Sequence, residues 1–206
     1  MGIRVMFFLG AEDGMLSHFI NGPLDLFEVW ADEEDERHPG LFGSDFLAFI
    51  RDIRERGVVA LQSTDAVRAA CVDRILYEYY GFFSVWVDGI LVQADESILP
   101  LRCYLAAVDI FKQSSVSQEI ITLWQYLVVG RPIVRDAKII PYTREHSSDS
   151  RLSYWTLSEC MYLKQALTPI TVKYIFDSEG KWAIDASLRA ISKAISSQVG
   201  LIMDIG

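Results

Sequence analysis

The stretch Ile3-Arg4-Val5-Met6-Phe7-Phe8-Leu9, which ends at Gly10, is the segment that decides the fold. A short apolar run bounded by glycine is typical of a buried strand. A second run of this kind, Leu-Ile-Met-Asp-Ile at 201–205, follows Gly200. We therefore expect the two terminal strands to lie together in one small sheet.

The strongest hairpin signal lies further along the chain, at 82–94. The segments 82–87 and 90–94 are rich in β-branched and aromatic residues, and they flank Asp88-Gly89. Because both turn positions of such a hairpin need a positive φ, an Asp-Gly dipeptide between two runs of this type predicts a hairpin. We expect it to join the terminal strands or to form a second small sheet. A further strand is expected at 171–176, followed by a turn at 177–180.

Amphipathic segments predict that the rest of the chain is rich in helices. Apolar residues recur at helical spacing between capping residues and glycine or proline breakers. The expected helices cover 45–56, 65–80, 100–112, 116–129, 157–168 and 185–199. The helices at 100–112 and 116–129 are expected to form an antiparallel pair, the first burying Leu101, Leu105, Val108 and Phe111.

The start of the helix at 157 has the clearest local signal. Thr156-Leu157-Ser158-Glu159 is a capping box, in which Thr156 serves the amide of Glu159 and the Glu159 side chain reaches back. Trp155 and Cys160 occupy the positions of a hydrophobic staple. Residues 131–153 lack periodicity and are expected to be irregular.

Length and composition restrict the fold class. The chain has 206 residues, of which 51% are hydrophobic, and a chain of this size buries roughly 70% of its unfolded surface. It contains no internal repeat and no low-complexity linker. We predict a single α+β domain over 1–206, helix-rich, with a small mixed or antiparallel sheet that includes the N- and C-terminal strands and a hairpin near 82–94.

Charge and cysteine usage narrow the possible partners and the compartment. The net charge of −9 argues against nucleic acid and anionic membranes, and it favours basic protein partners. No apolar stretch is long enough to predict a membrane span. The three cysteines, Cys71, Cys103 and Cys160, are far apart and are interpreted as buried free thiols, which suits a cytoplasmic protein.

Three segments carry a resemblance to a known family. Met1-Gly2-Ile3 leads directly into a strand, Trp124–Gly130 lies in mid-chain, and Leu157-Ser158-Glu159 starts a later helix. With the apolar strand after the last helix, the chain resembles the YfbM-like group of small uncharacterised bacterial proteins. The resemblance covers about a fifth of the chain, and the hairpin region departs from the pattern. It implies an α+β fold and transfers no activity and no catalytic residue.

Motifs for metal or cofactor chemistry are missing from the sequence. The histidines His18, His38 and His146 show neither the i, i+4 spacing nor the HExxH pattern, and no CxxC occurs, so no metal and no cofactor are expected. A carboxylate–histidine site at Asp35 and His38, or a general base at His146, remains an alternative to a solvated loop. A catalytic cysteine paired with a distant histidine is a further alternative. No catalytic residue is assigned.

The acidic run at 32–36 is the candidate binding site. It consists of Asp32, Glu33, Glu34, Asp35 and Glu36. A charged patch of this type steers the encounter with a partner of opposite charge. The function that we favour is a non-enzymatic cytoplasmic binding protein, such as an immunity-type protein that binds a basic partner. A run that is only solvated stays an open alternative for these five residues. The alternatives are a small hydrolase or transferase whose site combines Asp, Glu and His of the polar loops, and an oligomeric accessory protein; the oligomeric state stays open.

Overall fold

The computed structural model describes residues 3–10, 51, 55–56, 92–131, 151–173 and 178–206. Backbone contacts divide the chain into two units, of which the first consists of Met1–Glu12, Leu91–Ile133 and Tyr142–Gly206. Among the described residues, Arg51, Glu55 and Arg56 fall in the second unit, where they are helical and exposed. They agree with the helix expected over 45–56. The single domain over 1–206 stays a prediction.

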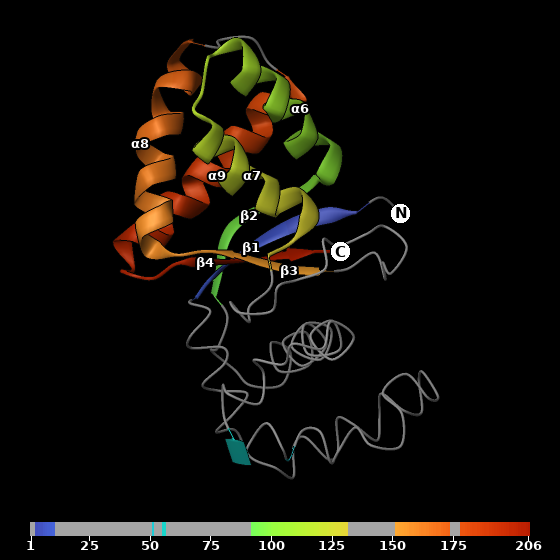
Figure 1. Ribbon diagram of the computed structural model, residues 1–206, viewed down its shortest axis with the longest axis vertical. Helices are drawn as coiled ribbons and strands as arrows, with labels where there is room; N and C mark the ends of the chain where they lie inside the picture. The colour runs from blue at the N-terminus through green and yellow to red at the C-terminus, as the bar shows by residue number, and fades with distance from the viewer. Residues whose placement is uncertain (1–2, 11–50, 52–54, 57–91, 132–150, 174–177) are drawn as a thin grey trace. The chain divides into compact units, whose positions relative to one another are not determined.

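The first unit contains a four-stranded antiparallel sheet of order β2-β1-β4-β3 (Figure 1). Its strands are β1 (Arg4–Leu9), β2 (Val92–Pro100), β3 (Arg151–Trp155) and β4 (Leu201–Ile205). The terminal strands β1 and β4 pair in unbroken register from Val5↔Ile205 to Leu9↔Leu201. The prediction that they meet in one sheet is therefore confirmed, as is the α+β class.

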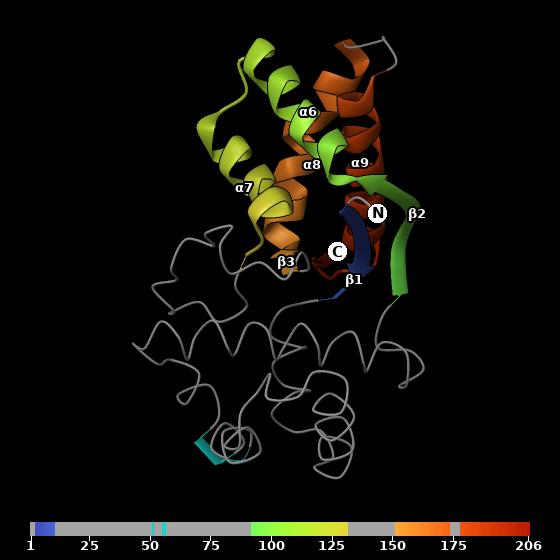
Figure 2. The ribbon, with the colours of Figure 1, turned by 90° about the vertical axis from the view of Figure 1, so that its right-hand side faces the viewer.

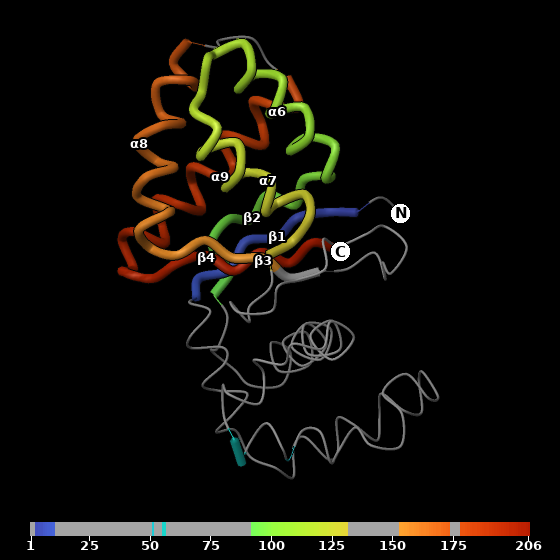
Figure 3. The backbone as a smooth tube through the Cα atoms, in the orientation of Figure 1, coloured from blue at the N-terminus to red at the C-terminus, as the bar shows by residue number. Residues whose placement is uncertain are grey.

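Four helices cover one face of this sheet (Figures 1 and 2). They are α6 (Leu101–Gln113), α7 (Gln118–Val129), α8 (Leu157–Lys173) and α9 (Glu179–Ser196). The short connection at 114–117 makes α6 and α7 run in opposite directions, as the chain trace in Figure 3 shows. Helix α9 lies against α6, α8 and the sheet. None of the described helices is long and apolar enough to cross a membrane.

Aromatic side chains fill the space between the helices and the sheet. Phe7 of β1 and Trp155 of β3 approach with ring centroids 6.3 Å apart, and Trp155 lies 6.2 Å from Trp124 of α7. Both indoles are fully buried. Trp124 Nε1 donates to the carbonyl oxygen of Tyr104, and Trp155 Nε1 donates to that of Leu123, each at 2.9 Å. A buried N–H without a partner would cost free energy, so these bonds allow tryptophan at the centre of the core.

The buried face of α6 differs from the expected one. Tyr104 and Phe111 pack on Trp124, at centroid distances of 5.9 and 4.9 Å. Leu105, which was expected to face inward, is 49% exposed. Apolar residues lie on several sides of this helix. Periodicity alone therefore does not show which side packs on Trp124.

Three element boundaries also correct the sequence-based expectation. Residues 151–153, expected to be irregular, belong to β3. Residues 171–173 were expected in a strand but are helical. Helix α8 does not end before Pro169 but continues through this exposed proline. Helix α9 begins at Glu179 rather than 185, since the Ser178 hydroxyl caps it by accepting from the Lys181 amide at 3.3 Å.

The predicted hairpin is only partly within the described residues. Residues 82–91 lie outside them, whereas 92–94 belong to β2, which extends to Pro100 and pairs with β1. The pairing is irregular, because Val5 lies opposite Leu99 while Phe7 lies opposite Asp95. Extra residues in β2 therefore bulge between these two pairs, which places Asp95 beside the helix layer.

Candidate functional site

The residues predicted to bind or to catalyse are not placed by the structure. Asp32, Glu33, Glu34, Asp35 and Glu36, and the histidines His18, His38 and His146, all lie outside the described residues. Within the part of the chain that the structure describes, no three His, Cys, Asp or Glu side chains come close enough to hold a metal ion. Among the described residues, two polar clusters in the helix-and-sheet unit are the candidate sites.

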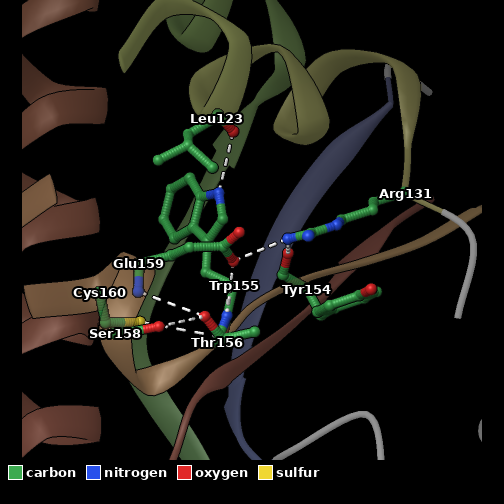
Figure 4. A network of polar contacts seen from close by, with 8 residues as sticks. All are labelled: Leu123, Arg131, Tyr154, Trp155, Thr156, Ser158, Glu159 and Cys160. Atoms are coloured by element: carbon green, nitrogen blue, oxygen red, sulfur yellow. Dashed lines mark hydrogen bonds and ion pairs between the residues drawn. The ribbon is translucent and has the colours of Figure 1, made fainter. Parts of the chain in front are cut away.

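The first cluster surrounds the guanidinium of Arg131, just after the end of α7 (Figure 4). Its Nη1 donates to Glu159 Oε2 at 2.7 Å and to the carbonyl oxygen of Tyr154 at 3.3 Å. Its Cζ lies 4.6 Å from the ring centroid of Tyr126 and 4.2 Å from that of Tyr154. We call the three residues that contact this guanidinium, Tyr126, Tyr154 and Glu159, the guanidinium cage.

The capping box predicted at 156–159 fixes the carboxylate of this cage. The amide of Thr156 donates to Glu159 Oε2 at 2.8 Å, and the amide of Glu159 donates to Thr156 Oγ1 at 3.2 Å. The prediction is confirmed. One carboxylate oxygen thus receives both the capping hydrogen bond and the ion pair with Arg131, and its charge is further favoured at a helix N-terminus.

The ion pair in the cage is largely shielded from water. The side chains of Arg131 and Glu159 are 18% and 21% exposed. Burial alone would lower the pKa of Arg131, but the hydrogen bond to Glu159 and the electrostatic interactions with Tyr154, Glu159 and Tyr126 together outweigh burial and raise that pKa. Arg131 is therefore always charged, and its attraction to the carboxylate is stronger than that of a surface pair.

Two buried thiols lie near these clusters and are unsuited to nucleophilic catalysis. Burial, with a smaller effect of Glu159, raises the pKa of Cys160 to about 12. Burial also raises the pKa of Cys103, followed in size by the charge of Glu179. The reactive form of cysteine is the thiolate, so both residues are inert at neutral pH. They are free, as the sequence predicted, while Cys71 lies outside the described residues.

The second cluster joins β2 to α9 through Asp95. Arg189 donates from Nε to Asp95 Oδ2 and from Nη2 to Ser97 Oγ, each at 2.8 Å. The Ser97 amide donates to Asp95 Oδ1, also at 2.8 Å. Burial alone would raise the pKa of Asp95, but the hydrogen bonds from Arg189 and Ser97 outweigh it, so that pKa is lowered.

Tyr104 lies close enough to Asp95 for the two to interact electrostatically. Its hydroxyl is buried and has no hydrogen-bond partner among the described residues. Burial, and after it the negative charge of Asp95, raise the pKa of Tyr104. Since the Asp95 pKa is lowered and the Tyr104 pKa is raised, neither group changes protonation near neutral pH. The cluster holds β2 and α9 together and is not suited to transfer protons at that pH.

Both clusters were missed at the level of sequence, for different reasons. Glu159 was found as part of a local capping motif, but its partner Arg131 lies 28 positions earlier. Asp95 and Arg189 are 94 positions apart and share no motif. A signal for Arg131 does exist: it directly follows Gly130, the residue that ends α7 with a φ of 82°. An arginine there is free of the helix and can turn toward a neighbouring element.

No protein-family model, curated protein or solved structure matches the chain. The resemblance to the YfbM-like group therefore stays a prediction.

Proposed function

We propose that the protein is a non-enzymatic binding protein that recognises a basic protein partner. The observation that carries the proposal is the segregation of charge along the chain. Residues 11–91 contain 16 of the 28 acidic residues but six of the 19 lysines and arginines, which gives this segment a net charge of −10 and the remainder +1. The acidic run at 32–36 is the densest part of that segment.

Solubility alone does not explain this distribution. Acidic residues that only keep a protein soluble would be expected to be interspersed with basic ones over the whole surface. Here the described helices and strands are close to charge balance, while one continuous segment carries the excess. A concentrated negative field accelerates encounter with a basic partner and selects against acidic ones. An immunity-type protein that neutralises a basic toxin would need this property.

The two described clusters support a binding role over a catalytic one. The pKa of Asp95 is lowered and those of Arg131 and Tyr104 are raised, in each case away from neutral pH, and burial raises the pKa of both thiols. The hydrolase-or-transferase alternative would need the histidines and carboxylates of the polar loops, and it stays a prediction, as does the oligomeric accessory protein.

The experiment is affinity capture from the native host at two salt concentrations. The full chain is compared with a variant that carries Asp32→Asn, Glu33→Gln, Glu34→Gln, Asp35→Asn and Glu36→Gln. The matched control removes five acidic residues outside 11–91, through Glu96→Gln, Asp109→Asn, Glu119→Gln, Glu145→Gln and Asp149→Asn. All three proteins are first checked for equal thermal stability.

We expect the native chain and the control to capture the same basic protein at about 50 mM salt. Capture should weaken steeply at about 500 mM, where the Debye length falls to roughly 4 Å. The variant in the run 32–36 should lose most of this capture. Equal loss in both variants would show that total charge matters rather than the run, and failure to capture any basic protein would contradict the proposed function.

A further inference from the structure

The guanidinium cage has the chemistry of a binding site for arginine. Glu159 offers a carboxylate oxygen, Tyr154 offers a backbone carbonyl oxygen, and the rings of Tyr126 and Tyr154 offer two π-faces at 4.6 and 4.2 Å. Charge-assisted hydrogen bonds together with cation–π contacts form a set suited to a planar guanidinium. In this chain the occupant is Arg131.

The residues of the cage lie in regular secondary structure, whereas Arg131 does not. Tyr126 lies in α7, Tyr154 in β3 and Glu159 in α8, so three regular elements hold the cage. Arg131 lies outside these elements, directly after the residue that ends α7. Its departure would therefore break no helix or strand hydrogen bond. Glu159 would also keep the Thr156 amide as a partner, because the capping bond does not involve Arg131.

We propose that the guanidinium cage is an arginine-binding site that Arg131 fills from within the chain, and that an arginine of a partner protein is the ligand that replaces it. The second half of this statement rests on the proposed function, since a basic partner supplies the arginine. Occupation by Arg131 is then autoinhibitory. A tethered side chain competes at an effective concentration of about millimolar, so an outside arginine binds well only once Arg131 is removed or drawn away.

The cage should distinguish arginine from lysine. A guanidinium is planar, spreads its charge and stacks on aromatic rings, whereas an ammonium is compact and strongly hydrated. Tyr154 is 2% exposed, so a cation in the cage must give up most of its water on that side. This loss penalises lysine more than arginine. Selectivity therefore separates a built site from simple attraction between opposite charges.

The test uses the full chain with Arg131→Ala and two small probes of equal charge. N-acetyl-L-arginine amide and N-acetyl-L-lysine amide are added at matched ionic strength, and the thermal midpoint is measured. We expect the arginine probe to raise the midpoint of the variant by about 3 °C at ten times its dissociation constant. The lysine probe should shift it by less than about 1 °C, and the native chain should respond to neither, because Arg131 occupies the cage.

A second variant identifies the carboxylate as part of the site. In the double variant Arg131→Ala with Glu159→Gln, the response to the arginine probe should be lost, although glutamine can still serve the capping box. Equal responses to both probes, an equal response of the native chain, or no response of Arg131→Ala would each overturn the proposed site. If Arg131→Ala is obtained unfolded, the same two probes are compared for the yield of refolded protein, with the same expected order.

The outcome is independent of the affinity capture from the host. A selective response of Arg131→Ala establishes the cage even if no basic partner is found, in which case only the partner arginine is overturned. If a basic partner is captured, its affinity for Arg131→Ala should be at least tenfold higher than for the native chain. An unchanged or lower affinity would overturn exchange with Arg131 and leave the proposed function standing.

Discussion

Arg189 donates its Nε to Asp95 Oδ2 at 2.8 Å and thereby ties α9 to β2 across 94 positions of the sequence. The two partners differ in exposure: the side chain of Asp95 is 7% exposed and that of Arg189 is 55% exposed. The carboxylate also accepts the Ser97 amide at the irregular part of β2. A buried charge with several donors depends on all of them, because the lost contact with water must be replaced.

Asp95→Asn is expected to destabilise the fold by about 1.5–3 kcal/mol at pH 7, because it weakens charge-assisted hydrogen bonds at a buried position. The pKa of Asp95 is lower in the folded chain than its ordinary value of 3.8. Its contribution to stability is therefore present above pH 3.8 and is lost as the pH falls through the lower folded value. Urea unfolding at several pH values from 7 to 3 should show the native chain and the variant converging below about pH 4.

Asp109→Asn is the matched control for this prediction. Asp109 also pairs with a basic residue, Lys112, but its side chain is 72% exposed. Its removal should leave the free energy of unfolding nearly unchanged at every pH. An effect of Asp109→Asn as large as that of Asp95→Asn would contradict the role given to burial.

Gly180→Ala tests the close packing of α9 on α6. A Cβ at this position would lie 2.8 Å from the backbone atoms Ala106 C and Ala107 N, neither of which can move away freely. The gain in helix propensity, about 1 kcal/mol, is expected to be smaller than the cost of separating the helices. We predict a net loss of about 1–3 kcal/mol in the free energy of unfolding, measured with urea.

Gly10→Ala provides a comparison of the same chemical change. A Cβ at Gly10 would meet the end of a flexible side chain, Ile202 Cδ1 at 2.9 Å, rather than backbone. Because that side chain can adjust, Gly10→Ala should cost clearly less than Gly180→Ala. The reverse order would show that the contact between α6 and α9 is looser than the structure describes.

The parts of the fold that the sequence predicted are those with local signals. The strand at 4–9 and the strand at 201–205 are apolar runs closed by glycine, and the capping box at 156–159 satisfies its own backbone groups. In each case the residues that define the element are neighbours in the chain. The pairing of β1 with β4 could be predicted because both strands are apolar and short.

The parts that were missed depend on contacts between distant residues. Strand β3 is five residues long, and its pairing with β4 is not visible in its own sequence. Gly180 suggested a turn, but in the fold it is a helical residue that allows α6 to approach. Arg131 and Arg189 looked like ordinary charged residues, since their carboxylate partners lie 28 and 94 positions away.

Substitutions at Glu159 and Thr156 separate the two roles of Glu159, in the capping box and in the ion pair with Arg131. Glu159→Gln should keep the hydrogen bond from the Thr156 amide but lose the ion pair with Arg131. Thr156→Ala should lose the hydrogen bond from the Glu159 amide to Thr156 Oγ1 and keep the ion pair. We expect Thr156→Ala to cost about 1 kcal/mol and Glu159→Gln about 1–3 kcal/mol, because Arg131 is largely buried. Chemical denaturation measures both values.

The coupling between Glu159 and Arg131 is measured by a double-mutant cycle. Combining Glu159→Gln with Arg131→Ala should destabilise by clearly less than the sum of the two single changes, since either one removes the same ion pair. Ser158→Ala, an exposed change in the same turn, should be close to neutral. Additive effects of the two changes would mean that the ion pair contributes little to stability.

The two described thiols provide the last prediction, because their pKa values determine their reactivity. Cys160 has a pKa of about 12 and is fully buried, and Cys103 is 2% exposed with a raised pKa. At pH 8 the thiolate that attacks a disulfide reagent is therefore scarce in both and shielded from the reagent.

In a Cys71→Ser variant, which retains only these two cysteines, we expect no labelling by a thiol-reactive disulfide within minutes. In about 6 M guanidinium chloride both should react fully, as thiols with an ordinary pKa near 8.5 do. Labelling of either thiol in the folded chain at the rate of a free thiol would contradict its burial and would restore it as a candidate nucleophile.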